Sequence, residues 1–81
     1  MKDMQTRLQE CIEMRKMIQH TDLMHKGSDN ENIIKNAMNN FVKDGTPCTL
    51  RLWADPNRRV RVVLVLTNNT DRQSGMTVEK P

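Results

Sequence analysis

Two alternating segments on either side of a turn, together spanning residues 48–66, constrain the fold of this chain more than any other feature. Apolar residues alternate with polar or charged ones along 48–54, and a second run rich in valine and leucine follows at 59–67. Successive side chains of a strand point to opposite faces, so each segment predicts one apolar and one mixed face. Aspartate followed by proline at the start of 55–58 is typical of a type I turn. The sequence therefore predicts an antiparallel β-hairpin.

The two faces also predict the register of this hairpin. Pairing Ala54 with Val60 keeps the apolar faces aligned and sets Trp53 opposite Arg61. The other register that preserves the faces would set Arg51 opposite Arg61, and like charges directly across a strand pair are unfavourable. We therefore expect the first register, with Trp53 beside Arg61.

An isolated hairpin is only marginally stable in water, so its apolar face needs a cover, and a predicted helix directly precedes it. Ser28 followed three residues later by Glu31 is a capping-box signal for the start of this helix. Gly45 and Pro47 mark its end. Its apolar stripe consists of Ile33, Ile34, Ala37, Met38, Phe41 and Val42.

A longer helix is predicted over 2–24, and it is apolar on two sides. One side follows the three- and four-residue steps of a coiled-coil seam and consists of Met1, Met4, Leu8, Cys11 and Ile18. The steps fail at Arg15, where an apolar residue is due. The other side carries Met14, Met17 and Met24. A helix with two apolar sides needs two surfaces to pack against, and we expect its own domain to provide one and a second copy of the chain the other.

Together these elements predict an α+β fold in which two amphipathic helices pack on a C-terminal antiparallel β-hairpin, in the order α-α-β-β. A chain of 81 residues has room for one domain with a modest core, which we place in 1–66. The connector 67–75 has no apolar side chain, whereas 76–79 alternates and is the candidate for a third strand. The polar composition favours a flexible C-terminal tail over 67–81 instead.

The chain contains two cysteines, Cys11 and Cys48, and its first residues do not form a secretory signal peptide. The longest apolar run, 62–66, is too short to span a membrane. We therefore interpret both thiols as reduced and expect an intracellular protein of the cytoplasm or nucleus.

Residue types that bind metals or perform catalysis occur in the chain without the spacing that such chemistry requires. Cys11, His20, His25 and Cys48 would suit zinc by type, but no pair has the ligand spacing of a zinc motif. Both cysteines lie on predicted apolar faces, where a thiol is buried and unreactive. The sequence also lacks a glycine-rich phosphate loop. We therefore expect a protein that is not an enzyme, with no catalytic residue, metal, cofactor or small-molecule substrate.

The positive charge of the chain is concentrated on the hairpin. The net charge is +3, and 47–66 carries four arginines against one aspartate. Arginine and tryptophan are enriched at the centres of protein interfaces. The expected partner-binding residues are Arg51, Trp53, Arg58, Arg59, Arg61 and Val63. The sequence thus predicts a protein–protein interaction or assembly module, an adaptor that binds a partner with this face and self-associates through Met4, Leu8, Cys11 and Ile18.

The same arginines support an alternative, a small RNA- or DNA-binding protein. Guanidinium groups bind phosphate oxygens in pairs, and an exposed tryptophan stacks on a base. Four arginines would neutralise few phosphates, so this binding would be weak and sensitive to salt. The apolar patches on the helix and the hairpin favour a protein partner.

Overall fold

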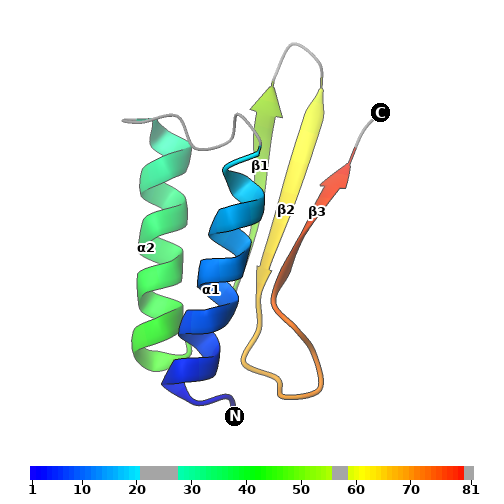
Figure 1. Cartoon of the computed structure of the whole chain (residues 1–81). Helices are drawn as coiled ribbons and strands as arrows, with labels where there is room; N and C mark the ends of the chain where they lie inside the picture. The colour runs from blue at the N-terminus through cyan, green and yellow to red at the C-terminus, as the bar shows by residue number, and fades with distance from the viewer. Residues whose placement is uncertain (21–27, 56–58, 80–81) are drawn as a thin grey trace.

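The structure is a computed structural model that describes residues 1–20, 28–55 and 59–79. They form two helices followed by a three-stranded antiparallel sheet, in the element order α-α-β-β-β (Figure 1). The elements are α1 (Met4–Ile18), α2 (Asp29–Asp44), β1 (Cys48–Asp55), β2 (Val60–Leu66) and β3 (Gly75–Glu79). The predicted α+β fold is confirmed, with a third strand added to the hairpin.

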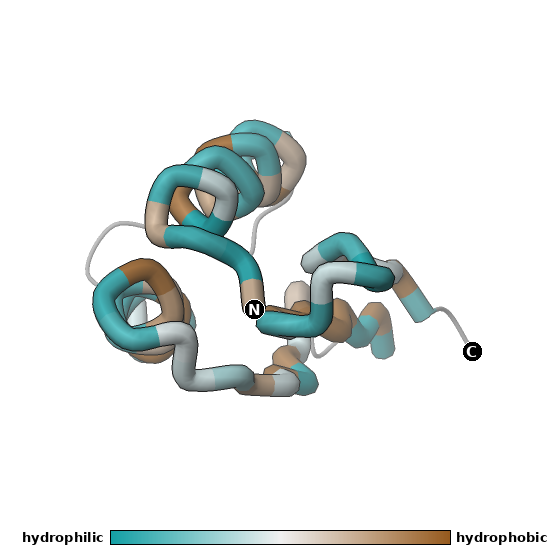
Figure 2. The backbone as a smooth tube through the Cα atoms, turned by 90° about the horizontal axis from the view of Figure 1, so that it is seen from below, coloured by the Kyte–Doolittle hydropathy of each residue, from teal (hydrophilic) through white to brown (hydrophobic). Residues whose placement is uncertain are grey.

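Both helices lie on one face of the sheet, as the view along their axes shows (Figure 2). The sheet order is β1-β2-β3, and α2 contacts β1 while α1 contacts α2 and β3. None of the described elements covers the opposite face of the sheet (Figure 2). The hydrophobic core therefore occupies the layer between the helices and the sheet. Its buried residues are Cys11, Met14, Ile18, Ile34, Met38, Phe41, Val62, Leu64 and Leu66.

The helices begin at the polar residues that cap them. Ser28 Oγ accepts a hydrogen bond from the Glu31 N–H at 3.2 Å, so the predicted start of α2 is confirmed. Asp3 caps α1, and the hydrogen bond that it accepts from the Thr6 N–H at 2.7 Å lowers the pKa of the Asp3 carboxyl. The helix ends at Ile18, before the predicted end of 2–24, and residues 21–24 lie outside the described ranges.

The register of the hairpin agrees with the prediction along most of its length. Trp53 lies opposite Arg61 and Arg51 lies opposite Val63. At the turn end, however, Val60 pairs with Asp55 rather than with Ala54, because a β-bulge shifts the register there. Arg59, directly before β2, has a left-handed backbone with φ 54°, which is a local feature that alternation of side chains cannot predict. The central residues of the predicted turn at 55–58 lie outside the described ranges.

The segment that the sequence favoured as a flexible tail contains a loop and β3. β3 pairs with β2 in antiparallel register, with Met76 opposite Leu64 and Thr77 opposite Val63. Met76 is half-buried and packs against the core. The third strand, which the sequence left as the alternative to a tail, is therefore part of the sheet.

Gly45, at the end of α2, occupies a position that other residues fit poorly. Its φ is 77°, and a Cβ atom here would lie 2.5 Å from Asn68 Nδ2. The Asn68 amide would have to move, although its Oδ1 accepts a hydrogen bond from the Lys2 N–H at 3.1 Å. We expect Gly45→Ala to lower the free energy of unfolding by about 1–2 kcal/mol, measured by urea denaturation. Gly75→Ala is the matched control, since a Cβ there has no neighbour within 4 Å; equal losses for the two variants would contradict this explanation.

Candidate interaction surface

The face of the sheet that points away from the helices carries side chains from all three strands. Residues that alternate with the buried Val62 and Leu64 form this face, which we call the outer face. It consists of Thr49, Arg51, Trp53, Arg61, Val63, Val65, Gly75, Thr77 and Glu79. Trp53 is 46% exposed and Val65 is 37% exposed. The predicted division into an inner apolar face and an uncovered mixed face is confirmed.

Trp53 and Arg61 form a stacked pair on the outer face. The two residues are cross-strand neighbours, and Arg61 Cζ lies 4.7 Å from the centroid of the Trp53 ring. A cation–π contact at an exposed site contributes about 0.5–1 kcal/mol. The Asn30 side chain also donates a hydrogen bond to the Trp53 carbonyl at 3.2 Å, which ties β1 to the first turn of α2. The backbone of Trp53 is therefore tied to α2, and its indole has a defined contact with Arg61 on the outer face.

Charged and apolar side chains are interspersed on the outer face. Arg61 has Trp53 as its neighbour on β1 and Glu79 as its neighbour on β3. Arg51 lies beside Val63, which is half-buried. The structure thus brings the predicted residues Arg51, Trp53, Arg61 and Val63 together on one face. Arg59 is exposed at the turn end of the hairpin, and Arg58 lies outside the described residues.

The four residues predicted for self-association do not share one exposed face. Met4 and Leu8 are exposed, whereas Cys11 and Ile18 are buried in the core of the same chain. Burial is the main cause that raises the pKa of the Cys11 thiol. A second copy of the chain could meet only Met4 and Leu8 of this set without opening the core.

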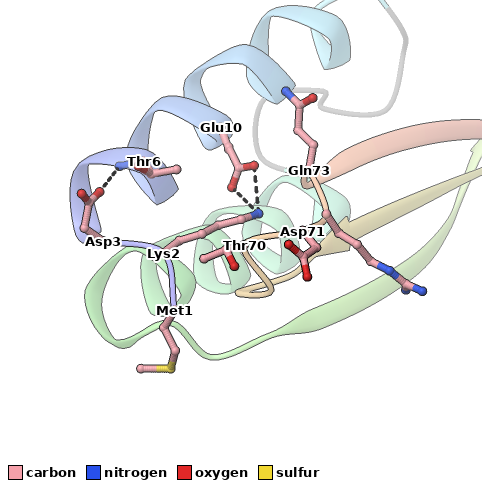
Figure 3. Close-up of a pocket in the computed structure, with 9 residues that line it drawn as sticks. Met1, Lys2, Asp3, Thr6, Glu10, Thr70, Asp71 and Gln73 are labelled. Atoms are coloured by element: carbon pink, nitrogen blue, oxygen red, sulfur yellow. Dashed lines mark hydrogen bonds and ion pairs between the residues drawn. The ribbon is translucent and has the colours of Figure 1, made fainter.

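A second group of polar side chains was not anticipated from the sequence, and it joins the N-terminus to α1 and to loop 67–74 (Figure 3). Lys2 Nζ lies 3.0 Å from both carboxylate oxygens of Glu10 and donates to the Thr67 carbonyl at 2.9 Å. The Ser74 N–H donates to Glu10 Oε2 at 3.1 Å, and Ser74 Oγ accepts from the Thr67 N–H at 3.0 Å. We call Lys2, Glu10, Thr67 and Ser74 the N-terminal bracket.

The N-terminal bracket is a structural feature. Only 5% of the Lys2 side chain and 9% of the Glu10 side chain are exposed, and each charge is neutralised by the other. The open hollow beside them in Figure 3 is lined by Met1, Asp3 and residues 70–73 as well, but the buried charges already have protein partners. The bracket therefore explains how a loop without apolar side chains is fixed to the domain.

Arg7 extends this polar contact to the end of α2. Its guanidinium is buried and donates to the Lys2 carbonyl and, at 3.1 Å, to the Val42 carbonyl. Val42 belongs to the last turn of α2, where carbonyl groups lack helical partners and attract a cation. One signal in the sequence points to this group. Arg7 and Glu10 lie at helical spacing from Cys11 and Met14, so two charged residues occur on the buried side of α1.

Within residues 1–20, 28–55 and 59–79, no three histidine, cysteine, aspartate or glutamate side chains are grouped so that they could hold a metal ion. Neither helix in these ranges is long and apolar enough to cross a membrane. A scan against protein-family models found no match to this chain, and searches of curated proteins and of solved structures found none either.

Proposed function

We propose that this protein is a non-enzymatic interaction module that binds another protein with the outer face of its sheet. The observation that carries the proposal is the exposed Trp53, held against Arg61 on a sheet whose opposite side forms the core. Interface centres are enriched in tryptophan and arginine, and an exposed tryptophan is a frequent binding hot spot. A β-sheet also presents these side chains with little loss of conformational freedom on binding.

The magnitude of the hydrophobic term supports a protein partner. Trp53 is 46% exposed, and burying the remainder of a tryptophan side chain contributes about 2–3 kcal/mol. Val65 adds a further exposed apolar side chain on the same face. By comparison, salt screens the electrostatic attraction between a ligand and Arg51 or Arg61.

Affinity capture with matched variants tests this function. Val65→Asp places a charge on the outer face, and Val78→Asp is its control, because Val78 is 45% exposed but pairs with the inward-facing Val62. After nuclease treatment of the extract, we expect a captured protein that the wild type and Val78→Asp retain and that Val65→Asp loses. Identical captured proteins for all three baits would contradict the proposal.

Nucleic-acid binding is the second candidate function, and the specific observation in its favour is that Arg51 and Arg61 share the outer face with an exposed indole. Base stacking on Trp53 with phosphates on the arginines would use the same residues. Fluorescence anisotropy with a single-stranded RNA separates the two candidates. Nucleic-acid binding requires that the RNA binds at physiological salt. Arg61→Ala must also make the affinity less dependent on salt, by the amount that corresponds to the loss of about one phosphate contact. If nuclease treatment of the extract removes every protein that the wild type captures, nucleic-acid binding is favoured over a protein partner.

A further inference from the structure

α1 exposes an apolar stripe that the core does not use. Met4, Leu8 and Ile12 are 56%, 46% and 39% exposed. They recur every four residues and therefore lie along one line of the helix. The buried side of α1 carries Cys11, Met14 and Ile18 instead. Two apolar sides were expected on this helix from its sequence, and the structure assigns different residues to them.

This stripe forms one wall of a groove between α1 and α2. The groove has a volume of about 340 Å³, and Met38, Asn39 and Val42 line it from α2. Met38 is buried and Val42 is half-buried, so the base of the groove continues the core of the domain. The two charged residues that line it are Arg15 and Lys43, and both are basic.

We propose that the groove between α1 and α2 binds an acidic amphipathic helix of another protein. An apolar groove between two helices accepts the apolar face of a third helix, whose anchors recur every three or four residues. Methionine side chains such as Met4 adapt to the shape of such a ligand. Arg15 and Lys43 favour a ligand with acidic residues beside its apolar anchors, because basic residues of the ligand at those positions would be repelled.

The same charges disfavour a second copy of the chain as the occupant. A two-fold symmetric contact places one surface patch against itself. Arg15 and Lys43 of one copy would then face the equally basic groove of the other copy. An acidic helix of another protein therefore takes the place of the self-association expected from the sequence. The groove is also a different surface from the outer face of the sheet.

Two designed peptides test the proposal with fluorescence anisotropy on the full chain. Each is about 18 residues long, with leucines at helical three- and four-residue spacing. One carries glutamate beside the leucines, and its twin carries lysine at the same places. We expect the glutamate peptide to bind at least about tenfold more tightly than the lysine peptide, a difference that two exposed ion pairs can supply.

Variants of the chain assign the binding to the groove. Leu8→Asp should abolish binding of the glutamate peptide. The double variant Arg15→Glu, Lys43→Glu should reverse the preference between the two peptides, which a misfolded chain would not do. Ile33→Asp is the matched control, because Ile33 is exposed on α2 but does not line the groove. Val65→Asp should also leave peptide binding unchanged, so this test is independent of the outer face.

Three results would overturn the proposal: no binding of the glutamate peptide, equal affinity for both peptides, or a preference that the double variant leaves unchanged. Sedimentation of the wild type tests separately whether a second copy of the chain occupies the groove. A mass of 9.5 kDa at high concentration agrees with the proposal. A dimer that Leu8→Asp dissociates would show that a second copy occupies the groove instead.

Discussion

Replacing Glu10 with alanine is expected to lower the free energy of unfolding by about 3–5 kcal/mol, because it leaves the ammonium group of Lys2 buried without its counter-charge. The change also removes the acceptor of the Ser74 N–H and so weakens the attachment of loop 67–74. An 81-residue domain has only about 4–12 kcal/mol in total. The variant should therefore unfold at a much lower urea concentration than the wild type.

Controls separate the loss of the buried pair from the loss of a surface charge. Glu13→Ala removes an exposed carboxylate from the same helix, and its effect should stay within about 0.5 kcal/mol. The double variant Lys2→Met, Glu10→Leu should be more stable than Glu10→Ala, because no charge remains buried without a partner. A loss below about 1 kcal/mol for Glu10→Ala would mean that the N-terminal bracket does not hold the domain together.

Trp53→Ala is expected to have the largest effect on binding of the captured partner. Truncation of a central interface tryptophan costs about 2–4 kcal/mol, which lowers affinity by roughly 30- to 1000-fold. The variant should remain folded, because Trp53 lies on the outer face and its contact with Arg61 contributes only about 0.5–1 kcal/mol. Titration calorimetry with the partner measures the first effect, and urea denaturation measures the second.

A comparison with Arg61→Ala shows how the pair acts. If the arginine mainly positions the indole, Arg61→Ala should weaken binding less than Trp53→Ala, and the double variant should resemble Trp53→Ala. Thr77→Ala, on the exposed side of β3, is the control on the same face and should change affinity by less than about 1 kcal/mol. Equal affinities for the wild type and Trp53→Ala would contradict a contact at this residue.

Alternation and capping residues predicted the parts of the fold that depend on local sequence. The faces of β1 and β2, most of their register and the start of α2 follow from such patterns. The pairing of Trp53 with Arg61 followed from avoiding two arginines opposite one another. The outer face could therefore be located from the sequence.

The remaining features depend on contacts between distant residues. Lys2 lies 65 positions before Thr67 in the chain, and the polar composition of loop 67–74 alone indicates a solvated loop. Periodicity also could not distinguish a seam for a second chain from the buried side of a helix, since both require the same spacing. For this reason Cys11 and Ile18 were expected at a self-contact but are buried in the core.

Acrylamide quenching of tryptophan fluorescence, in the free chain and in its complex with the captured partner, tests the use of the outer face directly. Trp53 is the single tryptophan of the sequence, so the whole signal reports on this surface. We expect efficient quenching in the free protein and strong protection in the complex, with protection absent when Val65→Asp is mixed with the partner. A complex in which Trp53 is quenched as readily as in the free chain would show that the partner binds elsewhere.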